Sequence, residues 1–297
     1  MEGVFVLSRY NLPMKFKAAC IQIAPVKANV PANLDKIAET ALQAQSEGAD
    51  LVCFSETATS GYFLEGGVLE CALTPDELAT ELKSRLSGKI TRPLDVSLGF
   101  YESSNGQLFN SSAYLELSES DATVKNIYRK FFLPTYGVFD EERFVARGRE
   151  FSTFETRFGT FATVICEDVW HSIVPTILAL KGAKVVLVPS ASPARGFSED
   201  KIGNLNRYRR LLQAISEEHG LFTINTQLCG FEGGKGFIGG SSIHDPFGKL
   251  VVESPVQEEN IAIAELNLDL IEVARQNSPL LADLQSTWSD IRRALPS

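Results

Sequence analysis

Histidine and metal-binding patterns are scarce in this sequence. Only three of its 297 residues are histidine, and none lies in an HExxH sequence or another short metal-ligand spacing. The five cysteines form no CxxC pair and are odd in number, so the sequence indicates neither a zinc ribbon nor a disulfide framework. Free thiols are typical of a reducing compartment, and we expect a cytoplasmic protein without a metal site.

An excess of positive charge and long apolar segments are missing as well. With 28 Lys and Arg against 37 Asp and Glu, the net charge is −9, which argues against a nucleic-acid partner. Even the longest apolar runs are short, such as residues 185–188, so we expect no membrane span. Residues 1–13 lack the basic start of a signal peptide, and Met14 could be a second start. We therefore expect an extension over residues 1–13 and a single domain over residues 14–297.

What is present is the composition of an ordinary folded globular protein, with 44% hydrophobic and 22% charged residues. The apolar period alternates between that of strands and that of helices along the chain. It predicts a strand over residues 16–23, helices over residues 33–47, 75–86, 171–181 and 198–219, and a hairpin that turns at residues 103–106. This alternation predicts one large mixed sheet, or two sheets faced by helices.

Three reactive side chains follow predicted strands directly. Cys166 lies between a strand and a helix, where backbone N–H groups lower the pKa of a thiol and can hold an oxyanion. Glu56 and Lys130 each follow another strand. Alone, each residue has a more ordinary explanation: a buried small thiol, a loop carboxylate and a surface lysine. Together they offer a nucleophile, a base and a cation for an oxyanion, in a chain with few histidines.

The segments around these residues resemble the nitrilase, or carbon–nitrogen hydrolase, superfamily over nearly the whole chain. They are FSETATSGY around Glu56, YRKFFLPTYGVFDEERF around Lys130 and VICEDVW around Cys166. The resemblance implies a Glu-Lys-Cys triad, a thioester intermediate, no cofactor, and a four-layer αββα sandwich of two mixed sheets flanked by helices. It also implies a homodimer or higher homo-oligomer with residues 170–181 at a two-fold interface.

Within this superfamily, LPTYGVFDE and CEDVW look most like the glutaminase domain of glutamine-dependent NAD synthetases. Glu167 stands where many nitrilases have tryptophan after the nucleophile, which favours an amide over a nitrile substrate. By the same resemblance, Glu141 matches a second glutamate beside the triad, with Glu142 as the adjacent alternative.

The resemblance also marks substrate-binding candidates. Tyr136 and Phe139 match positions that face the substrate in the glutaminase branch, although both could simply pack the loop. Arg195 lies on a segment that resembles the substrate-side loop of the family. It could meet a substrate carboxylate or be solvated.

These patterns lead us to expect an amidohydrolase that cleaves a small carboxamide, glutamine or a similar molecule, and releases ammonia. The alternatives are a nitrilase, an N-carbamoyl amidohydrolase, or a non-catalytic ammonia-supply or regulatory partner. The chain ends at Ser297 without an SGGxDS-type loop of an ATP-binding domain. We therefore expect a free-standing amidase, or a subunit that passes ammonia on, rather than a complete NAD synthetase.

Two further patterns compete with this interpretation. Residues 234–239 satisfy GxGxxG, but a dinucleotide site needs a helix after it, and residues 240–243 have the pattern of a strand. His171 follows Cys166 by five residues and could form a Cys-His dyad with it. The superfamily resemblance assigns no role to this histidine, so we favour Glu56 as the base.

Overall fold

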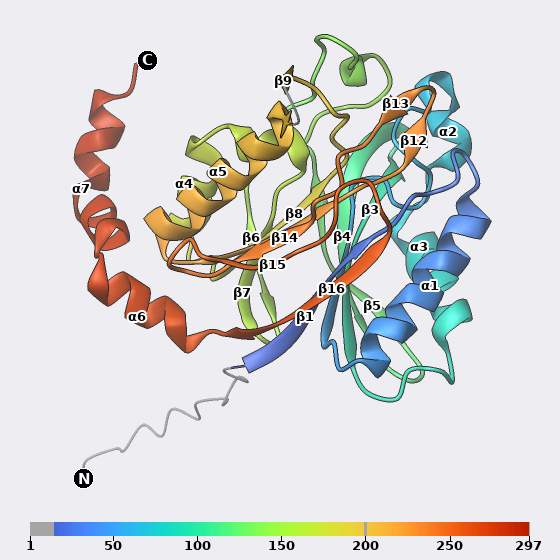
Figure 1. Ribbon diagram of the computed structural model, residues 1–297, viewed down its shortest axis with the longest axis horizontal. Helices are drawn as coiled ribbons and strands as arrows, with labels where there is room; N and C mark the ends of the chain where they lie inside the picture. The colour runs from blue at the N-terminus through green and yellow to red at the C-terminus, as the bar shows by residue number, and fades with distance from the viewer. Residues whose placement is uncertain (1–14, 199–200, 297) are drawn as a thin grey trace.

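Two six-stranded sheets form the centre of the molecule (Figure 1). The computed structural model describes residues 15–198 and 201–296, so the expected boundary between residues 1–13 and the domain lies outside the described residues. The first sheet has the order β16-β1-β2-β3-β4-β5. Its strands are β1 (Lys15–Gln22), β2 (Leu51–Phe54), β3 (Leu94–Ser104), β4 (Gln107–Leu117), β5 (Ala122–Arg129) and β16 (Asn260–Asn267).

The second sheet has the order β15-β14-β11-β8-β7-β6. Its strands are β6 (Thr153–Thr156), β7 (Gly159–Thr163), β8 (Val185–Ser190), β11 (Phe222–Gln227), β14 (Ser242–His244) and β15 (Leu250–Glu253). Each sheet has three neighbouring parallel strands, β1-β2-β3 and β7-β8-β11, with antiparallel strands on both sides. The two sheets are therefore both mixed and share one pattern.

Helices cover the outer face of each sheet. Figure 1 shows α1 (Val30–Ser46) and α3 (Pro75–Leu86) beside the first sheet, and α4 (Ile173–Leu180) and α5 (Gly203–His219) beside the second. After the last strand, α6 (Asp269–Asn277) leads to α7 (Leu280–Ala294), which packs on α4 and α5. The short elements are α2 (Val68–Cys71), the 3-10 helices η1 (Glu65–Gly67), η2 (Glu141–Arg143) and η3 (Cys166–Trp170), and the hairpins β9 (Phe197–Ser198) with β10 (Lys201–Ile202) and β12 (Phe231–Glu232) with β13 (Lys235–Gly236).

Three apolar cores separate the four layers. Leu34 and Leu82, from α1 and α3, are buried against the first sheet. Phe16 and Phe161 are buried between the two sheets. Leu212 of α5 belongs to the core behind the second sheet. This confirms the expected four-layer αββα sandwich.

Local sequence explains where several elements begin and end. The expected bounds of α3 are confirmed. The helix begins at Pro75 because Thr74 and Glu77 form a capping box at its first turn. The first hairpin turns at Asn105 and Gly106 alone, both with positive φ, as a two-residue turn requires. The helix expected over residues 198–219 begins only at Gly203, because Ile202 keeps an extended backbone and pairs with Phe197. The helix expected over residues 171–181 likewise starts later, after η3.

No helix in the described part of the chain is long and apolar enough to cross a membrane.

Candidate active site

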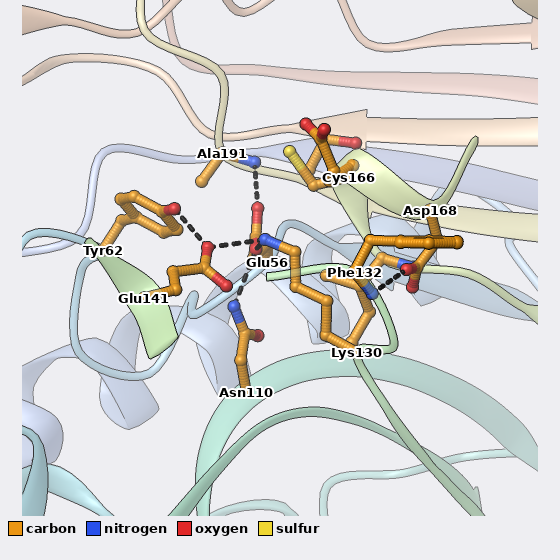
Figure 2. Close-up of polar contacts among 12 residues, drawn as sticks. Glu56, Tyr62, Asn110, Lys130, Phe132, Glu141, Cys166, Asp168 and Ala191 are labelled. Atoms are coloured by element: carbon orange, nitrogen blue, oxygen red, sulfur yellow. Dashed lines mark hydrogen bonds and ion pairs between the residues drawn. The ribbon is translucent and has the colours of Figure 1, made fainter. Parts of the chain in front are cut away.

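The ends of three strands bring the predicted triad together (Figure 2). Glu56 lies two residues after β2, and Lys130 directly follows β5, both in the first sheet. Cys166 lies three residues after β7 of the second sheet and is the first residue of η3. The cluster therefore spans both sheets, and its geometry depends on how they pack.

Lys130 is buried between two carboxylates. Its Nζ lies 2.7 Å from Oε1 of Glu56 and 2.6 Å from Oε1 of Glu141, and all three side chains are buried. Burial opposes the charged ammonium, but the two carboxylates outweigh it and raise the pKa of Lys130 well above its usual value. The structure places Glu141 in this cluster, whereas Glu142 is exposed.

Glu56 is held by donors on both of its oxygens. Besides Lys130, Oε1 accepts a hydrogen bond from Nδ2 of Asn110 at 2.8 Å, and Oε2 accepts one from the backbone N–H of Ala191 at 2.7 Å. Figure 2 shows these contacts converging on the carboxylate from three segments. These three donors fix the orientation of the Glu56 carboxylate.

Glu141 connects the cluster to Tyr62. Its Oε1 also accepts a hydrogen bond from the Tyr62 hydroxyl, while its Oε2 is buried without a partner in the described residues. Burial raises the pKa of Glu141 to about 7, and the nearby charge of Glu56 acts in the same direction. This carboxylate therefore changes protonation near neutral pH.

Cys166 adopts a strained backbone conformation. Its φ of 47° is in the left-handed region, which costs a non-glycine residue about 1 kcal/mol or more. Its Sγ lies 3.3 Å from the Tyr208 hydroxyl. Burial and the negative charge of Glu56 raise the pKa of the Cys166 thiol, while Lys130 opposes the shift. These surroundings therefore favour the neutral thiol over the thiolate.

Asp168 joins the loop after β5 to the turn before η3. Its fully buried carboxylate accepts hydrogen bonds from the backbone N–H of Phe132 at 2.8 Å, of Ile165 at 3.1 Å and of Phe131 at 3.2 Å. The Tyr128 hydroxyl donates a fourth, at 2.8 Å. Sequence reasoning missed this residue, although it lies inside the CEDVW motif.

The three predicted substrate-binding residues lie together. The guanidinium carbon of Arg195 is 4.8 Å from the ring centre of Phe139 and 6.0 Å from that of Tyr136. The Tyr136 hydroxyl donates to Oε2 of Glu167 at 2.8 Å, and Glu167 directly follows Cys166. A cation and a carboxylate therefore flank Tyr136, which is 47% exposed.

The structure disfavours the Cys-His alternative. The ring of His171 stacks on Phe132 with centroids 3.7 Å apart, and its Nε2 is 3.9 Å from Oε1 of Glu167. The hydrogen-bond partner of the Cys166 thiol is instead the Tyr208 hydroxyl. His171 therefore packs beside the site and does not contact the sulfur.

Residues 234–239 do not form a dinucleotide turn. They include β13 of a short hairpin and lead to β14, so a strand follows where a nucleotide fold needs a helix. Across residues 15–198 and 201–296, no three His, Cys, Asp or Glu side chains lie close enough together to hold a metal ion.

A cavity of about 210 Å³ lies beside the cluster. Its lining includes Tyr62, Phe63, Phe139, Glu141 and Lys235. Glu141 and Tyr62 link it to the buried lysine, but Cys166 does not line it. The cavity therefore lies next to Glu141 and Tyr62 rather than at the Cys166 sulfur.

Comparison with known proteins gives one family and several relatives. The family model described as carbon-nitrogen hydrolase matches residues 17–276. A glutamine-dependent NAD(+) synthetase of Acinetobacter baylyi is 27% identical, over 86% of this chain and 44% of its own length. The chain thus spans about half the length of such synthetases. A probable nitrilase of Schizosaccharomyces pombe is 27% identical, over 89% of this chain and 93% of its own.

A solved structure agrees with the fold. The carbon-nitrogen hydrolase from Helicobacter pylori G27 superposes with a TM-score of 0.77 at 22% identity, covering 91% of this chain and 95% of its own.

Proposed function

The chain belongs to the carbon–nitrogen hydrolase family, whose members hydrolyse carbon–nitrogen bonds other than peptide bonds, and on this premise we propose that it is an amidase with a cysteine nucleophile. The observation that carries the proposal is the buried ammonium of Lys130, held between Glu56 and Glu141 beside the thiol of Cys166. A nucleophile, a base and a fixed cation are the groups that acyl transfer requires.

The reaction begins when Glu56 accepts the thiol proton of Cys166 and the sulfur attacks the amide carbon. A C–S bond forms, and the Lys130 ammonium, with the N–H of Glu167 at the start of η3, stabilises the oxyanion. Glu56 then protonates the nitrogen as the C–N bond breaks and ammonia leaves. A water steered by Glu141 gives its proton to Glu56 and attacks the thioester carbon. The C–S bond then breaks, Glu56 returns the proton to the sulfur, and the acid leaves.

The charges of the cluster suit this sequence. Because the pKa of Lys130 is raised well above its usual value, the lysine remains an ammonium throughout the working pH range. It is buried and already hydrogen bonded, so little reorganisation is needed when the oxyanion forms. Removing one such donor typically costs about 100- to 1000-fold in kcat.

We propose glutamine, or another zwitterionic carboxamide, as the substrate. The Arg195 guanidinium offers a partner for the α-carboxylate, and its Nε is buried without an acceptor in the described residues. The Glu167 carboxylate offers a partner for the α-ammonium, and Tyr136 contacts both side chains. The synthetase relative, which its name describes as glutamine-dependent, supports the same choice.

A panel assay of ammonia release tests the proposal. The substrates are glutamine, asparagine, propionamide, an N-carbamoyl amine and propionitrile. We expect the highest kcat/KM with glutamine. Preference for propionitrile would instead favour a nitrilase, the name of the second relative, and preference for the N-carbamoyl amine would favour the carbamoyl branch. No turnover and no burst of one acyl group per chain would indicate the non-catalytic alternative.

Arg195→Ala tests the substrate class separately. We expect KM for glutamine to rise about 10- to 100-fold, the range of one hydrogen bond to a charged group, with little change for propionamide. Arg210→Ala is the matched control, because Arg210 is an exposed arginine of α5. Equal effects of Arg195→Ala on both amides would refute the carboxylate contact.

A further inference from the structure

Tyr208 has a polar contact that its sequence position does not suggest. It lies in the apolar stripe of α5 with Leu205, Leu212 and Ile215, all buried against the second sheet. Its hydroxyl is nevertheless the hydrogen-bond partner of the Cys166 sulfur, at 3.3 Å. The stripe alone predicts a core aromatic residue, for which phenylalanine would serve equally well.

The ring of Tyr208 is held in place by its neighbours. Trp170, at the end of η3, packs against it edge to face, with centroids 5.4 Å apart and an interplanar angle of 79°. Only 2% of Tyr208 is exposed. Because η3 begins at Cys166, the segment that carries the nucleophile also holds the ring whose hydroxyl contacts the sulfur.

We propose that Tyr208 is a further catalytic group, whose hydroxyl donates a hydrogen bond that stabilises the Cys166 thiolate when it attacks and again when it leaves. This inference rests on the proposed function, since it concerns the same nucleophile. It assigns to the reaction a residue outside the three motifs that carry Glu56, Lys130 and Cys166.

The sulfur needs such a donor because its surroundings disfavour a negative charge. Burial and Glu56 both raise the pKa of the Cys166 thiol. Lys130 opposes them, but its ammonium is already bound to Glu56 and Glu141 at 2.7 and 2.6 Å. Tyr208 remains protonated and able to donate, because burial first, and then the neighbouring Cys166, raise its own pKa well above the usual value.

The hydrogen bond between Tyr208 and Cys166 changes in direction and in strength during the reaction. In the resting state either the thiol or the hydroxyl can donate. Once Glu56 has taken the thiol proton, the sulfur can only accept, so Tyr208 must donate. Hydrogen bonds to charged acceptors are about twice as strong as neutral ones, and a thioester sulfur carries no such charge. The contact thus favours the thiolate over both the thiol and the thioester, as catalysis requires.

Alkylation of Cys166 by iodoacetamide across a pH series tests this role without a substrate. Mass spectrometry assigns the label to Cys166. We expect Tyr208→Phe to slow the alkylation about 10- to 100-fold at neutral pH and to move its pH midpoint upward. Tyr114→Phe is the matched control, because it removes a buried hydroxyl that donates to Asp95 at 2.6 Å between the sheets. It should lower the melting temperature without changing the alkylation profile.

An alkylation profile of Tyr208→Phe that coincides with that of the unaltered protein would overturn the inference. A second variant covers the case in which Tyr208→Phe does not fold. With 3-fluorotyrosine at position 208, a stronger donor of nearly the same shape, the pH midpoint should move downward, and an unchanged midpoint would again count against the role.

The two proposals fail in different ways. If Cys166 is alkylated and depends on Tyr208, but no amide is hydrolysed, the proposed function fails and the hydrogen bond stands. If amides are hydrolysed at Cys166 and Tyr208→Phe keeps full kcat and the same pH profile, only the inference about Tyr208 fails.

Discussion

Removal of the Asp168 carboxylate should damage both stability and catalysis. In Asp168→Ala, three backbone N–H groups and the Tyr128 hydroxyl lose their acceptor in a buried region. Each buried donor without a partner costs about 1–3 kcal/mol, but water entering the space left by the side chain recovers part of that loss. We therefore expect a loss of about 4 kcal/mol, close to the cost of breaking a buried charged contact. Because domains are stable by only about 5–15 kcal/mol, this loss is measurable by urea unfolding.

The catalytic effect follows from the position of Asp168. It ties the loop that begins after Lys130 to the turn that carries Cys166. A displacement of about 1 Å between reacting groups can cost about 100-fold in rate, so kcat should fall by at least tenfold even where the variant is folded. Asp168→Asn keeps the shape but presents an NH₂ group to some of these donors, so we expect an intermediate loss.

The measurement should be made at about pH 8. Burial raises the pKa of Asp168 to about 6, so the carboxylate is ionised there. Asp95→Asn is the control, because Asp95 is also a buried carboxylate, bonded to Tyr114 at 2.6 Å and to Arg157 at 2.8 Å, but lies outside the site. It should lose stability and keep kcat. Normal stability and normal kcat in Asp168→Ala would refute the reasoning.

The other predictions concern the cluster and assembly. Cys166→Ala should abolish turnover with a nearly unchanged melting temperature, whereas an active but unstable variant would make Cys166 a core residue. Glu141→Gln should lower kcat by orders of magnitude and Glu142→Gln should not; the reverse would exchange their roles. Because burial raises the pKa of Glu141 from 4.5 to about 7, the stability that its proton contributes is complete below about pH 4.5 and is lost as the pH rises through about 7. Glu141→Gln should flatten that dependence in unfolding measured between pH 4 and 8. We also propose a homodimer through residues 170–181. A monomeric mass, measured by light scattering at micromolar concentration, would contradict it.

The triad could be predicted from the sequence because each member lies at the end of a strand. Glu56 and Cys166 each follow the carboxyl end of a parallel strand, where α/β proteins place functional side chains, although the two strands belong to different sheets. Their order along the chain with Lys130 then led to the family resemblance. The alternation of strands and helices predicts only one large mixed sheet or two sheets faced by helices; the family resemblance implied the four αββα layers, which the structure confirms.

The supporting residues could not be predicted, because their contacts come from distant parts of the chain. Ala191 supplies only a backbone N–H, which has no signature in the sequence. Asn110 lies within β4 and meets Glu56 only because of the order of strands in the sheet. Tyr208 follows the period of a core residue on α5, and nothing in that period reveals the position of its hydroxyl. Such contacts depend on the register and packing of the sheets.

In the reaction that we propose, the charge balance of the cluster suits a buried carboxylate in the role of base. When the thiol of Cys166 gives its proton to Glu56, a negative charge moves from an oxygen to the sulfur within one buried group of side chains. The total charge around Lys130 is the same before and after, so no additional ion has to be buried. The remaining cost is the difference in stabilisation between the Glu56 carboxylate and the Cys166 thiolate. Lys130 contacts the carboxylate, and Tyr208 contacts the sulfur. A base in bulk water would instead leave an extra charge in the protein, and the burial that raises the pKa of the Cys166 thiol would oppose that reaction in full.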